Sequence, residues 1–83
     1  MKIVGILIKD RIKEANKTQE ILSKYSNIIK TRLGFHEVSE YTCSRIGFII
    51  LQLIDNKEEE YLSFKKELEE IGGIEIQEMK FKL

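Results

Sequence analysis

The sequence predicts an α+β fold in which a four-stranded antiparallel sheet carries two helices on one face. Segments rich in β-branched residues alternate with two segments whose apolar residues recur every three or four positions. Residues that start or end helices stand at the borders of both periodic segments. The 83 residues contain no proline, linker or repeat, and they are enough for one domain spanning 1–83.

The first strand and the first helix are predicted from the N-terminal third of the chain. Residues 3–8 (IVGILI) are apolar at both parities, which is typical of an interior strand. Asp10 is placed to cap a helix that follows. Apolar residues in this helix, at spacings of three, four and seven, predict a single buried stripe. The stripe consists of Ile12, Ala15, Leu22, Tyr25 and Ile29.

Two further strands are expected to form a hairpin. Residues 28–38 alternate, with Ile29, Thr31, Leu33 and Phe35 on one face. Residues 39–42 are the predicted connection, and 44–54 are the predicted partner strand. Gly47, in the middle of that partner strand, indicates the close approach of a side chain or of neighbouring backbone.

A second helix and a last strand complete the pattern. Asn56 with Glu59 resembles a capping box, and the acidic run 58–60 favours the positive end of a helix dipole. Gly72 and Gly73 are expected to end the helix in a left-handed turn. Its apolar stripe consists of Tyr61, Phe64, Leu68 and Ile71.

In the last predicted strand, residues 74–83, the apolar residues move from one face of the strand to the other partway along. Ile74 and Ile76 point to one face, whereas Met79, Phe81 and Leu83 point to the other. Either a β-bulge near residues 77–78 or a strand end that docks on another subunit would explain the change.

The order β-α-β-β-α-β is the split βαβ, ferredoxin-like topology, and right-handed crossovers place both helices on one sheet face. The other face should then be polar if it meets water. Residues 3–8 and 44–54 are instead apolar at both parities. We therefore expect a homo-oligomer, a dimer or tetramer, in which a second subunit covers this face and stabilises a small domain.

Composition excludes several classes of function. The formal net charge is +0, so the chain lacks the basic field of a dedicated nucleic-acid binder, and we expect no direct nucleic-acid contact. Cys43 is the only cysteine, which excludes an intrachain disulfide and favours the cytoplasm. The apolar N-terminal run 1–8 is too short for a signal peptide or a membrane span.

Five segments resemble one known family. They are 3–11 (IVGILIKDR), 19–25 (QEILSKY), 29–34 (IKTRLG), 43–51 (CSRIGFIIL) and 72–76 (GGIEI). Together they resemble the iron-only hydrogenase system regulator family over nearly the whole chain. The resemblance implies an ACT-like form of the fold, related to the C-terminal sensing domain of nickel-responsive repressors. It also implies a regulatory role. No helix-turn-helix or basic arm precedes Met1, so we expect transcriptional regulation to need a partner protein.

The resemblance also implies where a small effector binds. In ACT domains the loop after the first strand and the start of the first helix bind ligands at a subunit interface. Here Lys9, Asp10 and Arg11 occupy that loop, and Arg32 and Gly34 complete the candidate set. Free helix N–H groups and cations suit a carboxylate or a phosphate. The Pro-Gly turn of amino-acid-binding ACT domains is missing, and the alternative is that Asp10 only caps the helix while the cations are solvated.

His36 and Cys43 are the candidate metal ligands, because the nickel-sensing relatives use several histidines and one cysteine across an interface. One of each could form a site only with copies from facing subunits, and the alternative is a surface histidine and a half-buried thiol.

We expect no enzyme and no cofactor, since no nucleophile–base pair, carboxylate dyad or phosphate loop stands out. A small dimeric ferredoxin-like enzyme is the alternative, with an interfacial pocket lined by His36 or Tyr41.

Overall fold

The computed structural model describes residues 1–38 and 43–82, and the side chains of residues 1–34 and 46–82. The elements are β1 (Lys2–Ile8), α1 (Arg11–Lys24), the 3-10 turn η1 (Ser26–Ile28), β2 (Ile29–Val38), β3 (Cys43–Leu53), α2 (Glu58–Ile71) and β4 (Ile74–Lys80). The predicted element order is confirmed. The predicted hairpin connection at 39–42 lies outside the described residues.

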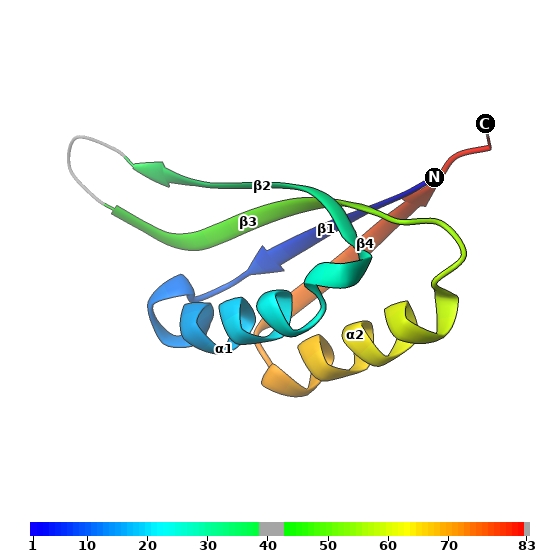
Figure 1. Cartoon of the computed structure of the whole chain (residues 1–83). Helices are drawn as coiled ribbons and strands as arrows, with labels where there is room; N and C mark the ends of the chain where they lie inside the picture. Colours follow the sequence, from blue (N-terminus) through cyan, green and yellow to red (C-terminus); the bar gives the residue numbers. More distant parts are fainter. Residues whose placement is uncertain (39–42, 83) are drawn as a thin grey trace.

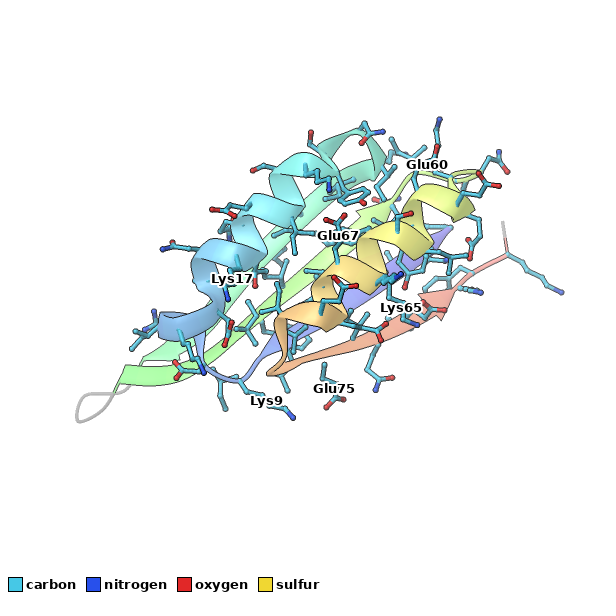
Figure 2. The ribbon with its side chains drawn as sticks, turned by 90° about the horizontal axis from the view of Figure 1, so that it is seen from below. Lys9, Lys17, Glu60, Lys65, Glu67 and Glu75 are labelled. Atoms are coloured by element: carbon cyan, nitrogen blue, oxygen red, sulfur yellow. The ribbon has the colours of Figure 1, made fainter. Side chains whose placement is uncertain are left out.

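The four strands form one antiparallel sheet in the order β2-β3-β1-β4, and both helices lie on the same face of it (Figure 1). This arrangement confirms the α+β, ferredoxin-like fold. Seen from the helix side, α1 lies toward β2 and β3, and α2 lies toward β4 (Figure 2). Strand β2 is an edge strand, because it stands first in the strand order.

The core fills the space between the helices and the sheet. Its largest fully buried side chain is Phe64 of α2, and the predicted α2 stripe is confirmed by the burial of Tyr61, Phe64 and Leu68. The core residues are Val4, Ile6, Ile8, Leu22, Ile28, Ile49, Leu51, Leu53, Tyr61, Phe64 and Leu68. None of the helices in the described part of the chain is long and apolar enough to cross a membrane.

Helix α1 begins as predicted, and its predicted stripe is confirmed in part: Leu22 is buried, and Tyr25 and Ile29 pack against the core. The Asp10 carboxylate accepts a hydrogen bond from the Lys13 backbone N–H at 3.3 Å, which confirms the cap. Ile12 is 65% exposed, so its place in the buried stripe was wrong. The buried positions are Glu14, Thr18 and Leu22, which follow one another at a spacing of four. Thr18 tolerates burial because its hydroxyl donates to the Glu14 carbonyl oxygen at 2.9 Å.

The start of α2 also differs from the prediction. The helix begins at Glu58, and Lys57 stands at the cap position without a side-chain hydrogen bond. Asn56 has a φ of 64°, a left-handed conformation that asparagine tolerates, so it shapes the preceding turn and does not cap the helix. The predicted left-handed helix end is confirmed, with φ values of 80° at Gly72 and 63° at Gly73.

The bulge predicted in the last strand is wrong, because β4 pairs with β1 without a register shift from Ile74 to Lys80. Ile76 pairs opposite the buried Ile6, whereas Met79 pairs opposite Ile3 on the other face. The apolar positions alternate differently along β4 because its first half contributes apolar residues to the core and its second half contributes Met79 to the opposite face of the sheet. A register shift lies instead in β2, between Ile29 and Thr31. It turns Ile29 toward the core, so the prediction that Ile29 shares a face with Thr31 and Leu33 is wrong.

Candidate functional site

A groove lies between α1 and the edge strand β2 on the helix side of the sheet. Its volume is about 200 Å³. Arg11, Ala15 and Gln19 of α1 form one wall, Arg32 and Gly34 of β2 form the other, and Gly47 of β3 lies on the floor. We call this the α1–β2 groove. It is open because the main contacts of α1 within the sheet are with β1 and β3.

Two glycines shape the floor of the groove in different ways. A Cβ atom at Gly47 would lie 3.3 Å from the Cβ atom of Arg11, so glycine lets the first turn of α1 approach the sheet. The close approach predicted for Gly47 is confirmed. At Gly34 a Cβ atom would lie 3.9 Å from Cγ1 of Ile49, an ordinary contact. Glycine at position 34 thus leaves space in the groove without being needed to avoid a clash.

Arg32 reaches from the sheet edge toward α1, where its Nη2 donates a hydrogen bond to Oε1 of Gln19. Arginine carries five N–H donors in a planar fork, so this bond uses only a part of its capacity. Arg11 and Arg32 are the charged residues among the described lining of the groove, which contains no Asp or Glu. The described lining of the groove therefore presents two positively charged groups.

The structure separates the predicted ligand residues into two groups. Arg11, Arg32 and Gly34 line the α1–β2 groove. Asp10 caps α1, and the Lys9 backbone N–H donates to the Gly73 carbonyl oxygen at 2.9 Å on the β4 side of β1. Figure 2 shows Lys9 at the same end of the molecule as Glu75.

Sequence reasoning missed Gln19 as a groove residue. Arg11, Ala15 and Gln19 follow one another at a spacing of four, which places them on one face of the helix. This spacing was the available signal. Apolar periodicity alone could not reveal it, because two of the three residues are polar.

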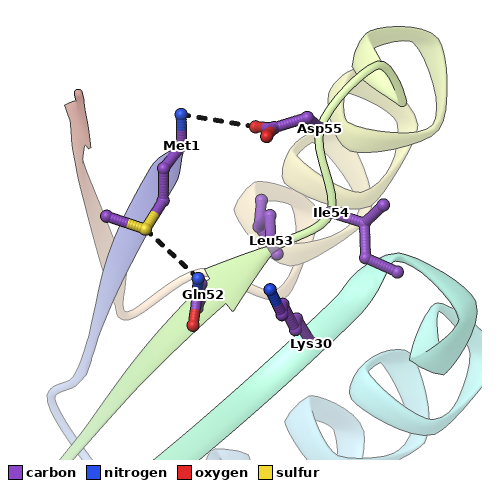
Figure 3. Close-up of a pocket in the computed structure, with 6 residues that line it drawn as sticks. All are labelled: Met1, Lys30, Gln52, Leu53, Ile54 and Asp55. Carbon is purple, nitrogen blue, oxygen red and sulfur yellow. Dashed lines mark hydrogen bonds and ion pairs between the residues drawn. The ribbon is translucent and has the colours of Figure 1, made fainter. Parts of the chain in front are cut away.

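A second pocket, of about 420 Å³, lies where β1 and β3 meet the loop before α2 (Figure 3). The Met1 ammonium pairs with Asp55 at 3.3 Å, and Nε2 of Gln52 donates to Sδ of Met1 at 3.1 Å. Lys30 contributes a further ammonium. Most polar groups of this pocket are thus already paired with one another.

The metal hypothesis concerns side chains outside the described ones. Strand pairing places His36 opposite Gly47 and Cys43 opposite Val38. Among the residues whose side chains the structure describes, no three His, Cys, Asp or Glu residues gather as a metal site would require. A metal site at His36 and Cys43 stays a prediction.

Two carboxylates join elements of the fold through tyrosines. Glu67 accepts hydrogen bonds from Lys24 and from Tyr25, and these bonds lower the pKa of Glu67. Glu78 accepts from Tyr61, whose pKa is raised by burial first and by that hydrogen bond second. All these shifts move the pKa away from neutrality. A general acid or base needs the opposite direction.

The second face of the sheet has no helix on it (Figure 1). We call it the free sheet face. Its large apolar residues are Ile3, Leu7, Leu33, Ile46, Phe48, Ile50, Met79 and Phe81. Leu33 is 59% exposed and Met79 is 56% exposed. Among the described residues at paired positions on this face, Glu75 is the only charged one.

Comparison with solved structures supports the fold. The chain is similar to the uncharacterized protein TM1266 from Thermotoga maritima, with a TM-score of 0.76 and 26% identity, over 98% of this chain and 95% of that one. It is also similar in fold to the 5-chloro-2-hydroxyhydroquinone dehydrochlorinase TftG from Burkholderia phenoliruptrix AC1100 in complex with 2,5-dihydroxybenzoquinone. That match has a TM-score of 0.56 and 16% identity, over 96% of this chain and 93% of that one. No curated protein sequence matches the chain.

The sequence comparison with protein families is more specific. Residues 1–78 match the TM1266-like family, described as an iron-only hydrogenase system regulator. This match covers almost the entire chain and agrees with the structural similarity to TM1266. The chain therefore belongs to the TM1266-like family of iron-only hydrogenase system regulators.

Proposed function

We propose that this chain is one ACT-like regulatory domain of an iron-only hydrogenase system that acts as a homo-oligomer in the cytoplasm. In this proposal two copies associate through their free sheet faces, and a small effector or a partner protein shifts the equilibrium of association. Any transcriptional effect passes through that partner protein, without direct contact between this chain and DNA. The observation that carries the proposal is the exposed and almost uncharged free sheet face.

The composition of this face favours burial. Leu33, Ile46 and Met79 are each more than half exposed, and they lie on three different strands. Monomeric proteins rarely expose contiguous apolar patches larger than a few hundred Å². Removing such a surface from water contributes roughly 25 cal/mol per Å² of apolar area.

A second copy of the chain is the occupant that we propose. Closed dimers are usually isologous, so the same patch faces itself across a two-fold axis. A face with one charged residue at its described paired positions meets its own copy with little like-charge repulsion. Glu75 lies on the edge strand β4 and can remain at the solvent-exposed rim of such an interface.

Effector control follows from differential affinity. A ligand shifts an association equilibrium only if it binds the two states unequally. A regulator of this type needs no catalytic group, and the directions of the pKa shifts at Glu67, Glu78 and Tyr61 agree with a structural role. The likeness to the dehydrochlorinase concerns the fold. An enzyme would be favoured instead if a small aromatic substrate were turned over by the purified chain.

Light scattering after size-exclusion chromatography tests the assembly, with Leu33→Glu as the disrupting variant. Leu33 lies on the free sheet face, and a buried unpaired carboxylate there should dissociate the oligomer. Ile12→Glu is the matched control, because Ile12 is similarly exposed but lies on α1. We expect a wild-type oligomer, an oligomeric Ile12→Glu protein and a monomeric Leu33→Glu protein. A wild-type chain that is monomeric at high concentration would refute the proposed assembly.

The regulatory role is tested in cells that carry an iron-only hydrogenase. We expect hydrogenase transcript or activity to change when the gene for this chain is deleted. Ile12→Glu should restore the wild-type level, whereas Leu33→Glu should not. An unchanged hydrogenase level after deletion would contradict a role in that system.

A further inference from the structure

The geometry points to the α1–β2 groove as a binding site for a small organic anion, a carboxylate or phosphate with a short apolar part. This inference deepens the proposed function by naming the chemical class of the effector. It rests on the proposed function only for the consequence of binding, since binding itself can be measured in a chain of any oligomeric state.

The two guanidinium groups in the described lining set the sign of the ligand. Arg11 enters from the first turn of α1, and Arg32 enters from the edge strand. No Asp or Glu is present among the described lining residues, and no described carboxylate pairs with Arg32. A planar guanidinium binds a carboxylate or a phosphate with two parallel hydrogen bonds. Two guanidinium groups on opposite walls therefore favour an anion between them.

The apolar surface of the groove sets the rest of the ligand. Ile8, Ala15 and Ile49 contribute apolar atoms to the lining, next to the backbone of Gly34 and Gly47. A volume of about 200 Å³ lies below the range of roughly 300–1,000 Å³ that is typical of drug-sized ligands. The ligand is thus a small metabolite with a short aliphatic part, and a dinucleotide is too large.

Gln19 holds Arg32 in place before a ligand arrives. Its Oε1 accepts the hydrogen bond from Arg32 Nη2, which orients the guanidinium over the groove. Its own amide N–H₂ group remains a donor for a ligand oxygen. A carboxylate at position 19 would instead pair with Arg32 as an internal anion and compete with the ligand. Glutamate at this position should therefore block the site with hardly any change in shape.

The decisive experiment is a titration of the full chain followed by amide NMR shifts. The probes are butyrate, its neutral amide butyramide, and inorganic phosphate. We expect saturable shifts with butyrate or phosphate in residues 11–19, 32–34 and 47–49, and none with butyramide. Saturation with one anion and not the other identifies which of the two sources the groove prefers.

Three variants test the mechanism. Gln19→Glu and Arg32→Gln should each weaken anion binding by about tenfold or more, the usual effect of losing a charge-assisted hydrogen bond. Gly34→Ala should weaken it sterically, without a change in charge. Ser63→Asp is the matched control, since it adds the same charge as Gln19→Glu at an exposed position of α2, which does not line the groove. At 0.1 M salt this distant charge is largely screened, so its effect should stay below about threefold.

The outcomes separate this inference from the proposed assembly. Equal binding of butyrate and butyramide, no saturable shift with either anion, or wild-type affinity in Gln19→Glu would each overturn the anion site. Light scattering on the same samples reports the oligomer independently. If the chain is monomeric and binds the anion, the anion site is supported and the proposed assembly is refuted. If the chain is oligomeric and does not bind the anion, the assembly is supported and the anion site is refuted.

Discussion

The buried phenol of Tyr61 in α2 donates a hydrogen bond to the carboxylate of Glu78 in β4, and this bond fastens the helix to an edge strand of the sheet. The ammonium of Lys2 in β1 lies 3.8 Å from the centre of the same ring. It also pairs with Glu58 at the start of α2 at 2.9 Å. Three separate segments thus meet around one aromatic side chain.

The hydrogen bond between Tyr61 and Glu78 makes part of the free energy of unfolding depend on pH. The hydrogen bond from Tyr61 lowers the pKa of Glu78 in the folded chain. A carboxyl group with a lowered folded pKa stabilises the fold above its unfolded pKa of about 4.3, and this contribution is lost as the pH falls through the folded pKa. Tyr61→Phe should therefore lower the free energy of unfolding by about 1 kcal/mol at pH 7 and by less at acid pH. Urea denaturation at both pH values measures the difference.

The control for this prediction is Glu78→Gln, alone and combined with Tyr61→Phe. The two substitutions should be non-additive at pH 7, because each removes the same charged hydrogen bond. A Tyr61→Phe effect of equal size at neutral and acid pH would show that Glu78 ionisation does not contribute.

The cap of α1 predicts a second result. Asp10→Ala removes the acceptor of the Lys13 backbone N–H and should destabilise the chain by about 0.5–2 kcal/mol. Asp10→Asn should restore most of the stability, since asparagine caps helices about as well. Thermal denaturation compares the three proteins. An Asn variant as unstable as the Ala variant would assign the loss to the charge of Asp10 and not to capping.

The end of α2 predicts a contrast between two glycines. Gly72 has a φ of 80° and a ψ of 159°, a region that L residues rarely adopt, although a Cβ atom there would meet no other atom within 4 Å. Gly72→Ala should destabilise the chain by about 1–3 kcal/mol through backbone strain alone. Gly34→Ala should be close to neutral, because Gly34 shows no such φ value and its Cβ atom would make an ordinary contact. Equal losses in both variants, measured by urea denaturation, would contradict this explanation.

The core predicts the largest single loss. Phe64 is fully buried, and its ring centre lies 5.4 Å from that of Tyr25. Phe64→Ala should reduce the free energy of unfolding by about 3–5 kcal/mol, which combines the lost transfer energy with the cavity left behind. Phe81→Ala is the control, because Phe81 is 47% exposed on the free sheet face. If the chain assembles through that face, the Phe81 variant should weaken association more than it weakens the folded subunit.

The sequence alone determined the order of the elements, the start of α1 and the end of α2. Local signals sufficed there, because Asp10 caps its own helix and Gly72 and Gly73 end α2 through backbone preferences that need no distant partner. The apolar stripe of α2 was also readable from spacing. Each of these features depends on residues within a few positions of one another.

Only the tertiary structure decided the rotation of α1 about its axis, the register of β4 and the place of the groove. Ile12 is exposed and Thr18 is buried because the packing of α1 on β1 and β3 sets the rotation of the helix, whereas its own periodicity does not. Arg11 and Arg32 are 21 positions apart (32 − 11 = 21), and they meet only because the edge strand passes beside α1. Contacts between distant segments depend on the path of the whole chain, and local propensity carries no information about that path.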